Sequence, residues 1–263
     1  MGEVTIQYIS DLHIDSNRCW PDIIPVSKNI AICGDVGSPF DPLVKEFYAE
    51  MVAKFERVFV VAGNHEYYWN VIADVDDEMG RIPGIIFLNN TSYDLTDEIR
   101  ILGTTLWSDI DRNMHRTALP NDYRRIYTNK GILLTFDDTI DMHNDAVAWL
   151  DREIYTASAE GGPNKQVLIL THHAPLNIMN GKFIGTPRES AFATDLMHLF
   201  RNPVVGFING HTHQNMTCWH NGISVTCNAV GYKSEALDYN PGAIFKFAWQ
   251  MCDQNRLKKR RIV

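Results

Sequence analysis

The chain has 263 residues, of which 45% are hydrophobic, so it can bury a large core, and we expect a single domain over residues 1–263. A net charge of −8 argues against a protein coated with basic surface for nucleic acid. Five cysteines without a Cys-x-x-Cys pair are typical of a reducing compartment rather than of a disulfide framework or a zinc ribbon. Since no stretch suits a signal peptide or a membrane span, we expect a cytoplasmic protein without a membrane partner.

Apolar runs and turn residues divide the first hundred residues into strands and helices. A continuous apolar run such as 30–33 is typical of a strand buried on both faces. A fourfold apolar spacing predicts a helix over 42–55, and a second helix is expected over 67–79. The strands of this part are expected at residues 4–10, 30–33, 57–62, 85–87, 92–95 and 99–103. Strand, helix and strand in succession indicate an α/β fold with parallel pairs.

Residues 107–137 are the least regular part of the chain and are rich in Asp, Asn and Arg. We interpret them as a long excursion over the functional site, because long irregular segments in compact domains are often functional; an ordinary surface loop is the alternative. A helix is expected from an N-cap at Asp138 to about Ala159, and a short helix over 191–200. The remaining strands are expected at residues 167–170, 204–208, 217–219, 223–227 and 243–249.

Five stretches share one form, in which an expected strand leads into polar residues with metal-ligand chemistry. They are Asp-Leu-His at 11–13, Gly-Asp at 34–35, Gly-Asn-His-Glu at 63–66, Thr-His-His at 171–173 and Gly-His-Thr-His at 210–213. Ligands of α/β folds sit beyond the carboxyl ends of the strands, so we expect all five stretches to converge on one site.

The residue types of these stretches suit metal ions. Histidine nitrogen with carboxylate oxygen is typical of first-row divalent ions such as Mn, Fe, Zn, Co or Ni. The candidate ligands are Asp11, His13, Asp35, Asn64, His172, His211 and His213. Seven ligands are too many for one ion that keeps an open position, but two ions sharing one carboxylate use them well, and Asp35 is the natural bridge. Gly34, Gly63 and Gly210 precede ligands where the chain must turn sharply off a strand.

Taken together and in this order, the five stretches resemble a calcineurin-like metallophosphoesterase from residue 11 to residue 213. The resemblance implies a four-layer α/β/β/α sandwich with two divalent ions, Mn²⁺ first among them, at the strand ends. The expected ligands of one ion are Asp11, His13, Asp35 and His213. Asp35 would bridge to the second ion, whose other expected ligands are Asn64, His172 and His211. A metal-bridging hydroxide would attack phosphorus. His65 would protonate or orient the leaving oxygen without binding metal, and Asn64 would help to position the phosphate.

The resemblance also bears on the substrate. Residues 34–37 are followed by Ser38-Pro39, so the second Asp and the Arg-Gly of the protein phosphatases are missing. We therefore expect a phosphodiesterase acting on a small phosphate-ester or nucleotide substrate. The alternatives are a phosphomonoesterase, a dinucleotide pyrophosphatase or a nuclease, of which the nuclease is not favoured. An inactive scaffold is the alternative outside enzymes, and the complete ligand set argues against it. The oligomeric state is left open.

Three aromatic residues and a histidine near these stretches have less defined roles. Tyr67 and Tyr68 directly follow the Gly-Asn-His-Glu stretch and could line the substrate cleft or pack in the core. Trp107 follows an expected strand and could stack on a base. His173 would lie behind the ligand His172 or face the substrate.

Overall fold

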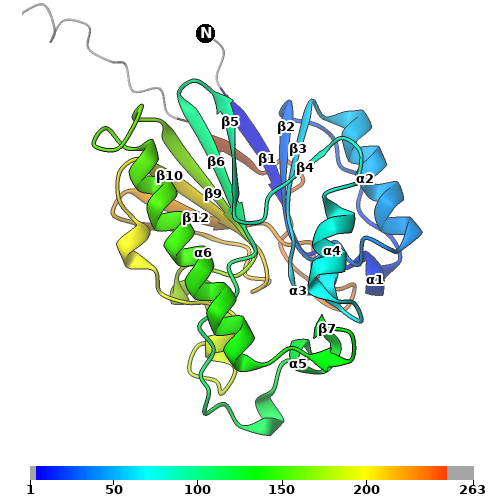
Figure 1. Ribbon diagram of the computed structural model, residues 1–263. Helices are drawn as coiled ribbons and strands as arrows, with labels where there is room; N and C mark the ends of the chain where they lie inside the picture. Colours follow the sequence, from blue (N-terminus) through cyan, green and yellow to red (C-terminus); the bar gives the residue numbers. More distant parts are fainter. Residues whose placement is uncertain (1–3, 248–263) are drawn as a thin grey trace, which may run out of the picture.

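Two β-sheets pack face to face between two layers of helices, and the computed structural model describes residues 4–247 of this arrangement (Figure 1). The first sheet has the strand order β13-β1-β2-β3-β4, and the second has the order β11-β12-β10-β9-β6-β5. The first sheet contains β1 (Thr5–Ile9), β2 (Asn29–Cys33), β3 (Arg57–Val61), β4 (Ile85–Phe87) and β13 (Ile244–Lys246). The second contains β5 (Thr91–Thr96), β6 (Ile99–Thr104), β9 (Gln166–Thr171), β10 (Val204–Asn209), β11 (Thr217–His220) and β12 (Ile223–Cys227).

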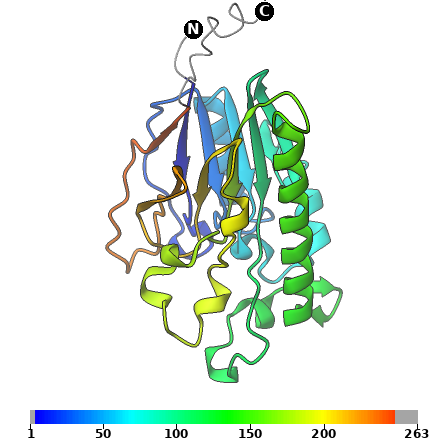
Figure 2. The ribbon, with the colours of Figure 1, turned by 90° about the vertical axis from the view of Figure 1, so that its left-hand side faces the viewer.

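Helices α2 (Pro42–Lys54) and α4 (Ile72–Met79) cover the outer face of the first sheet, and the long α6 (Phe136–Ala157) covers that of the second (Figures 1 and 2). Strand β2 shows why its apolar run is continuous. Ile30 and Ile32 pack toward α2, whereas Ala31 and Cys33 pack between the two sheets. The four-layer α/β/β/α sandwich expected from the sequence is therefore confirmed.

The central strands run parallel, which brings their carboxyl ends to one end of the molecule. β1, β2, β3 and β4 form successive parallel pairs, as do β6, β9, β10 and β12. Two short helices, α1 (Ile14–Asn17) and α3 (Asn64–Tyr67), begin just beyond this end. The antiparallel strands β13, β5 and β11 flank the parallel ones. None of the helices within residues 4–247 has the length and apolar character that a membrane crossing needs.

The segment 107–137 leaves this end of the sheets and folds into small elements of its own. They are a 3-10 turn at Arg116–Ala118, α5 (Asp122–Arg125) and a hairpin of β7 (Tyr127–Asn129) and β8 (Ile132–Leu133). The segment meets the body of the protein again where Val71 pairs with Tyr127 and where the Trp69 amide donates to the Arg125 carbonyl.

The structure corrects four expected boundaries. The helix expected over 67–79 is two helices, because Trp69 is left-handed and residues 69–71 bond to the segment 125–127 instead. The helix expected from Asp138 begins at Phe136, since Thr135 caps it and Asp138 closes the capping box as its third residue. Residues 191–200 hold the last residue of one 3-10 turn (Glu189–Ala191) and the whole of another (Met197–Leu199), because the Thr194 and Leu196 amides bond to the chain after β9. The last strand ends at Lys246, and residues 248–249 lie outside the described part.

Candidate metal centre

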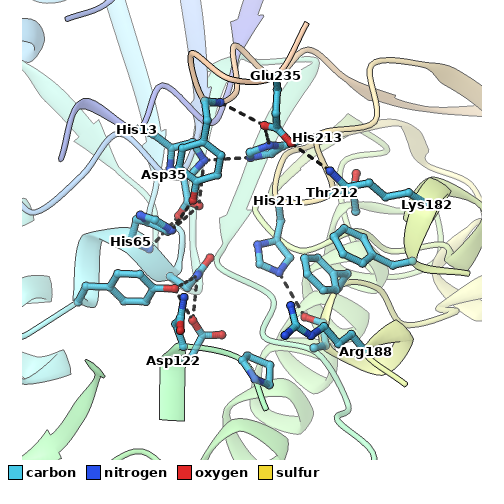
Figure 3. Close-up of a pocket in the computed structure, with 18 residues that line it drawn as sticks. His13, Asp35, His65, Asp122, Lys182, Arg188, His211, Thr212, His213 and Glu235 are labelled. Carbon is cyan, nitrogen blue, oxygen red and sulfur yellow. Dashed lines mark hydrogen bonds and ion pairs between the residues drawn. The ribbon is translucent and has the colours of Figure 1, made fainter. Parts of the chain in front are cut away.

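The five polar stretches meet at the carboxyl ends of strands from both sheets. Residues 11–13, 34–35 and 63–66 follow β1, β2 and β3 of the first sheet. Residues 171–173 and 210–213 lie at the ends of β9 and β10 of the second sheet. Figure 3 shows the pocket that they form, with His13, Asp35 and His65 on one side and Lys182 and Arg188 on the other.

Asp11, His13 and His213 form a first cluster of potential ligands. Nε2 of His13 lies 2.9 Å from Nε2 of His213, which lies 3.4 Å from Oδ1 of Asp11. Oδ2 of Asp35 lies 3.8 Å from Nε2 of His13. Asp11 and His13 are buried. Burial, reinforced by the neighbouring His65, holds the pKa of His13 well below its usual value, which leaves a neutral imidazole able to bind a cation.

Asn64, His172 and His211 form a second cluster. Nε2 of His172 lies 3.1 Å from Oδ1 of Asn64 and 3.2 Å from Nδ1 of His211. Oδ1 of Asp35 lies 3.3 Å from the same nitrogen of His172. The two oxygens of Asp35 therefore face different clusters.

The far side of each candidate ligand in the second cluster forms a hydrogen bond, which decides which atom of that side chain faces inward. Nδ1 of His172 donates to the Cys33 carbonyl at 2.8 Å, and Nε2 of His211 donates to the Ala191 carbonyl at 3.2 Å, because a carbonyl can only accept. The amide nitrogen of Asn64 donates to Oδ1 of Asp122 at 2.9 Å.

As a result, every inward atom of the second cluster is an acceptor. When both rings are neutral, His172 Nε2, His211 Nδ1 and Asn64 Oδ1 turn lone pairs toward one another and toward Oδ1 of Asp35, which accepts only the His65 backbone amide at 2.8 Å among the described residues. A buried group of acceptors is costly unless a donor or a cation satisfies it. The donor set of nitrogen and oxygen atoms fits a divalent first-row metal, and the outer hydrogen bonds are of the kind that orient metal ligands.

His213 of the first cluster is oriented in the same way. Its Nδ1 donates to Oε2 of Glu235 at 2.5 Å, which turns Nε2 toward Asp11 and His13. Glu235 also accepts from Nζ of Lys182 at 3.0 Å and from the Tyr232 amide at 3.2 Å. The segment 232–235 thus supports the first cluster, although sequence reasoning did not single it out.

The backbone around the ligands is held in conformations that ordinary residues seldom adopt. Asp11, His13, Asp35, His211 and His213 all have a φ between 46° and 67°, in the left-handed region. His211 and His213 both take this conformation, so the chain turns between them instead of continuing as a strand. Gly63 serves a close approach, since a Cβ at this position would lie 2.3 Å from Oδ1 of Asp35.

The buried Glu66 joins the turns that follow β2 and β3. Its Oε1 accepts from the Val36 and Gly37 amides at 2.7 and 3.3 Å. Its Oε2 accepts from the Gly63 and Asp35 amides at 2.7 and 3.0 Å. The fourth residue of the Gly-Asn-His-Glu stretch is therefore a structural anchor of the turns that present Asp35 and Asn64.

His65 stands beside the two clusters with both ring nitrogens engaged elsewhere. Nδ1 lies 2.8 Å from Oδ2 of Asp15, and Nε2 lies 3.1 Å from the hydroxyl of Tyr232. Burial alone would lower the pKa of His65, but the carboxylates of Asp35 and Asp15 outweigh it and raise the pKa to about 9. His13, Asp15 and His65 form a third group with metal-ligand spacing, which shares His13 with the first cluster.

The remaining candidates divide between pocket and core. Tyr68 lines the pocket, whereas Tyr67 is buried and donates to Asp76 at 2.8 Å. Trp107 is buried against Tyr67 and His173, so it belongs to the core and does not offer a surface on which a base could stack. His173 is buried behind the second cluster, with its ring 4.1 Å from that of His211.

A model of the calcineurin-like phosphoesterase family matches residues 4–215. The chain belongs to this family. An uncharacterized protein of Acanthamoeba polyphaga mimivirus is 31% identical to this phosphoesterase over 272 residues, spanning 90% of this chain and 95% of that protein. The solved structure of phosphopantetheinyl hydrolase from Mycobacterium tuberculosis is similar with a TM-score of 0.67 and 17% identity, covering 88% of this chain and 90% of its own. At that identity the likeness shows a shared fold.

The family confirms the resemblance drawn from the five stretches. The protein is a hydrolase that acts on phosphate-ester bonds, and its histidine and aspartate clusters could hold divalent metal ions.

Proposed function

We propose that this phosphoesterase is a binuclear enzyme that cleaves phosphodiesters of small, nucleotide-type substrates. The observation that carries the proposal is the position of Asp35, whose two oxygens face two separate groups of ligands. Asp11, His13 and His213 would hold one ion, and Asn64, His172 and His211 the other, with Mn²⁺ as the proposed metal. When bound, two such ions neutralise charge on the phosphoryl oxygens and lower the pKa of water.

The proposed role of His65 is to deliver a proton to the leaving oxygen. Asp15 holds the proton on Nδ1, so Nε2 is the atom that faces the pocket. Asn64 is fixed through Asp122 and Tyr68, and its oxygen is thereby aimed at the site. Asp122 belongs to the irregular segment 107–137, so we propose that this segment shapes the substrate side of one continuous domain.

The charges around the pocket support a phosphodiester rather than a monoester. Asp35, Asp122 and Glu235 line the pocket together with the basic Lys182 and Arg188. Glu235 already pairs with Lys182. A phosphodiester carries one negative charge and a monoester dianion carries two, so additional carboxylates penalise the monoester more strongly.

Aromatic rings beside the second cluster support a nucleotide-type substrate. Phe183 and Phe192 stack with their ring centroids 3.7 Å apart, and the Phe192 ring lies 4.7 Å from that of His211. Both phenylalanines line the pocket, where a flat ring gives a base a surface on which to stack. The cavity of about 250 Å³ suits a compact ligand better than a nucleic acid duplex.

The free cysteines support a cytoplasmic location. Within the described residues, Cys19, Cys33, Cys218 and Cys227 are unpaired thiols, which suits a reducing compartment.

The experiment that tests the proposal compares bis(p-nitrophenyl) phosphate with p-nitrophenyl phosphate as substrates, with added Mn²⁺ and measured metal content. We expect faster cleavage of the diester and two ions per chain. His65→Ala should keep both ions and lose about 10²–10⁴-fold in turnover, as expected for a general acid. The exposed His198→Ala is the matched control. Asp35→Asn should empty or disorder both sites.

Each of the other possible results would assign a different function to the protein or a different role to His65. Faster monoester cleavage would indicate a phosphomonoesterase. A chain with neither metal nor activity would be an inactive scaffold. Loss of metal in His65→Ala would make His65 a ligand rather than an acid.

A further inference from the structure

Tyr232 lies beyond residue 215, where the family match ends, yet the structure holds it inside the site. The Gly231 amide donates to the Asp11 carbonyl at 2.9 Å, next to the first cluster. The side chain of Asn17 donates to the Gly231 carbonyl at 2.9 Å and accepts from the Lys233 amide at 3.1 Å. Both neighbours of Tyr232 are therefore tied to the turn that presents Asp11 and His13.

The side chain of Tyr232 connects His13 with His65. Its ring stacks on the imidazole of His13, with centroids 4.0 Å apart and an interplanar angle of 14°. Its hydroxyl lies 3.1 Å from Nε2 of His65. The stacked ring contact with His13 holds the ring in the orientation that brings its hydroxyl to His65. Tyr232 therefore contacts both a candidate metal ligand and the proposed general acid.

The Tyr232 hydroxyl lies next to the ring nitrogen from which His65 would donate its proton. Nδ1 of His65 faces Asp15, so Nε2 is the only ring atom left for a substrate. That nitrogen faces the Tyr232 hydroxyl. A hydroxyl can donate one hydrogen bond and accept two, and no second partner of this hydroxyl occurs within residues 4–247. It can therefore accept from His65 while it donates to an oxygen in the pocket.

We propose that Tyr232 is a further catalytic residue, whose hydroxyl touches the leaving oxygen and passes to it the proton held by His65. This inference rests on the proposed function. The bond from phosphorus to the leaving oxygen breaks, and its electron pair stays on that oxygen. The oxygen takes the hydroxyl proton of Tyr232, and the hydroxyl takes the Nε2 proton of His65. His65 keeps its Nδ1 proton against Asp15 and regains the other from water, which also supplies the oxygen for the new bond to phosphorus.

Tyr232→Phe tests the proposal, because it keeps the ring on His13 and removes only the hydroxyl. The substrates are methyl aryl phosphodiesters with aryl groups from p-nitrophenyl to unsubstituted phenyl. The variant should lose less than about threefold in kcat/KM on the p-nitrophenyl ester, whose leaving group needs little help from an acid. It should lose about tenfold or more on the phenyl ester, because a basic leaving group depends on proton transfer. Tyr239→Phe, from the same segment, is the matched control.

A double variant tests whether Tyr232 and His65 act on the same proton. Tyr232→Phe combined with His65→Ala should be no slower than His65→Ala alone, since both act on one proton. An equal loss on every ester, or a loss that multiplies in the double variant, would overturn the relay. If the wild type cleaves only monoesters, the same comparison of leaving groups is made with aryl phosphomonoesters. A failure of the proposed phosphodiesterase activity can therefore be told apart from a failure of the proposed role of Tyr232.

A measurement without turnover checks the contact itself. In nitrogen-15 spectra of the histidine rings, Tyr232→Phe should shift Nε2 of His65 and leave its Nδ1 unchanged. An Nε2 signal at the wild-type position would show that the hydroxyl does not touch His65 and would overturn the proposal.

Discussion

Asp15 accepts a hydrogen bond from Nδ1 of His65 at 2.8 Å, so a residue just after the first polar stretch orients the histidine of the third. The Gly-Asp stretch lacks the second carboxylate of the protein phosphatases, which leaves His65 without a partner from that side. Asp15 lies in α1, two residues after His13, and reaches His65 from the chain that follows β1, although β2 separates β1 from β3 in the sheet. The carboxylate keeps the proton on Nδ1 and turns Nε2 toward the pocket.

Asp15→Asn should therefore reduce turnover without emptying the site. We expect a loss of about 10–100-fold in kcat, as for other residues that orient a functional histidine, with little change in KM. The measurement is steady-state kinetics on the preferred p-nitrophenyl ester together with metal content. Asp22→Asn, at an exposed acid before β2, is the control. Loss of metal would instead assign Asp15 to the ligands, in line with its place in the third group.

Glu66→Gln should destabilise the whole protein. Four backbone amides point at the two oxygens of Glu66, and a glutamine would turn its own NH₂ group toward two of them. Two buried donors then lose their acceptor, at a cost of about 3 kcal/mol in the free energy of unfolding. Urea unfolding compares the variant with Glu46→Gln, an exposed position of α2. Equal stability of the two variants would contradict the anchoring role.

The sequence predicts the strands and their functional ends better than it predicts the partners of the ligands. An apolar run shows directly that a strand such as β2 is buried on both faces, and the polar residues after it mark the site. Tyr232 and His65 are 167 residues apart, and no local pattern reveals that they meet. The same holds for Glu235 and His213, which come together where the chain after β12 pairs with Ser10, directly after β1.

Local patterns also fail where tertiary hydrogen bonds override them. The spacing around 191–200 suits a helix, but Thr194 bonds back to Ala174 beside the second cluster. Ala191, in the preceding 3-10 turn, supplies the carbonyl that orients His211. A regular helix over these residues would remove that carbonyl from its place, so the irregular backbone is part of the site.

Glu235→Gln should weaken one metal site and leave the other intact. Glutamine retains an acceptor for Nδ1 of His213 but loses the charge that makes the imidazole a stronger ligand. We expect the affinity for one of two ions to fall by about 10–100-fold. Titration against a chelator, with metal content measured at each step, resolves the two ions. The exposed Glu160→Gln is the control. Equal weakening of both ions would contradict the assignment of Glu235 to the first cluster alone.

Asp94 should contribute stability at neutral pH that disappears in acid. Hydrogen bonds from Arg100 and Lys165, each 2.7 Å long, lower the pKa of Asp94 to about 2. Because the pKa is lower in the folded than in the unfolded chain, the contribution is complete above about pH 4 and is lost as the pH falls toward 2. The side chain is 45% exposed, so solvent screening limits the effect to less than about 1 kcal/mol.

Urea unfolding of the wild type and Asp94→Asn at pH 7, 5 and 3 measures this contribution. The difference between the two proteins should be the same at pH 7 and pH 5 and should shrink at pH 3, where the unfolded chain takes up a proton more readily than the folded one. Asp97→Asn, at the exposed turn between β5 and β6, provides the reference for removing an acid at this end of the sheet. A difference that widens in acid would mean that Asp94 destabilises the folded protein when charged, and its ion pairs with Arg100 and Lys165 would then contribute nothing.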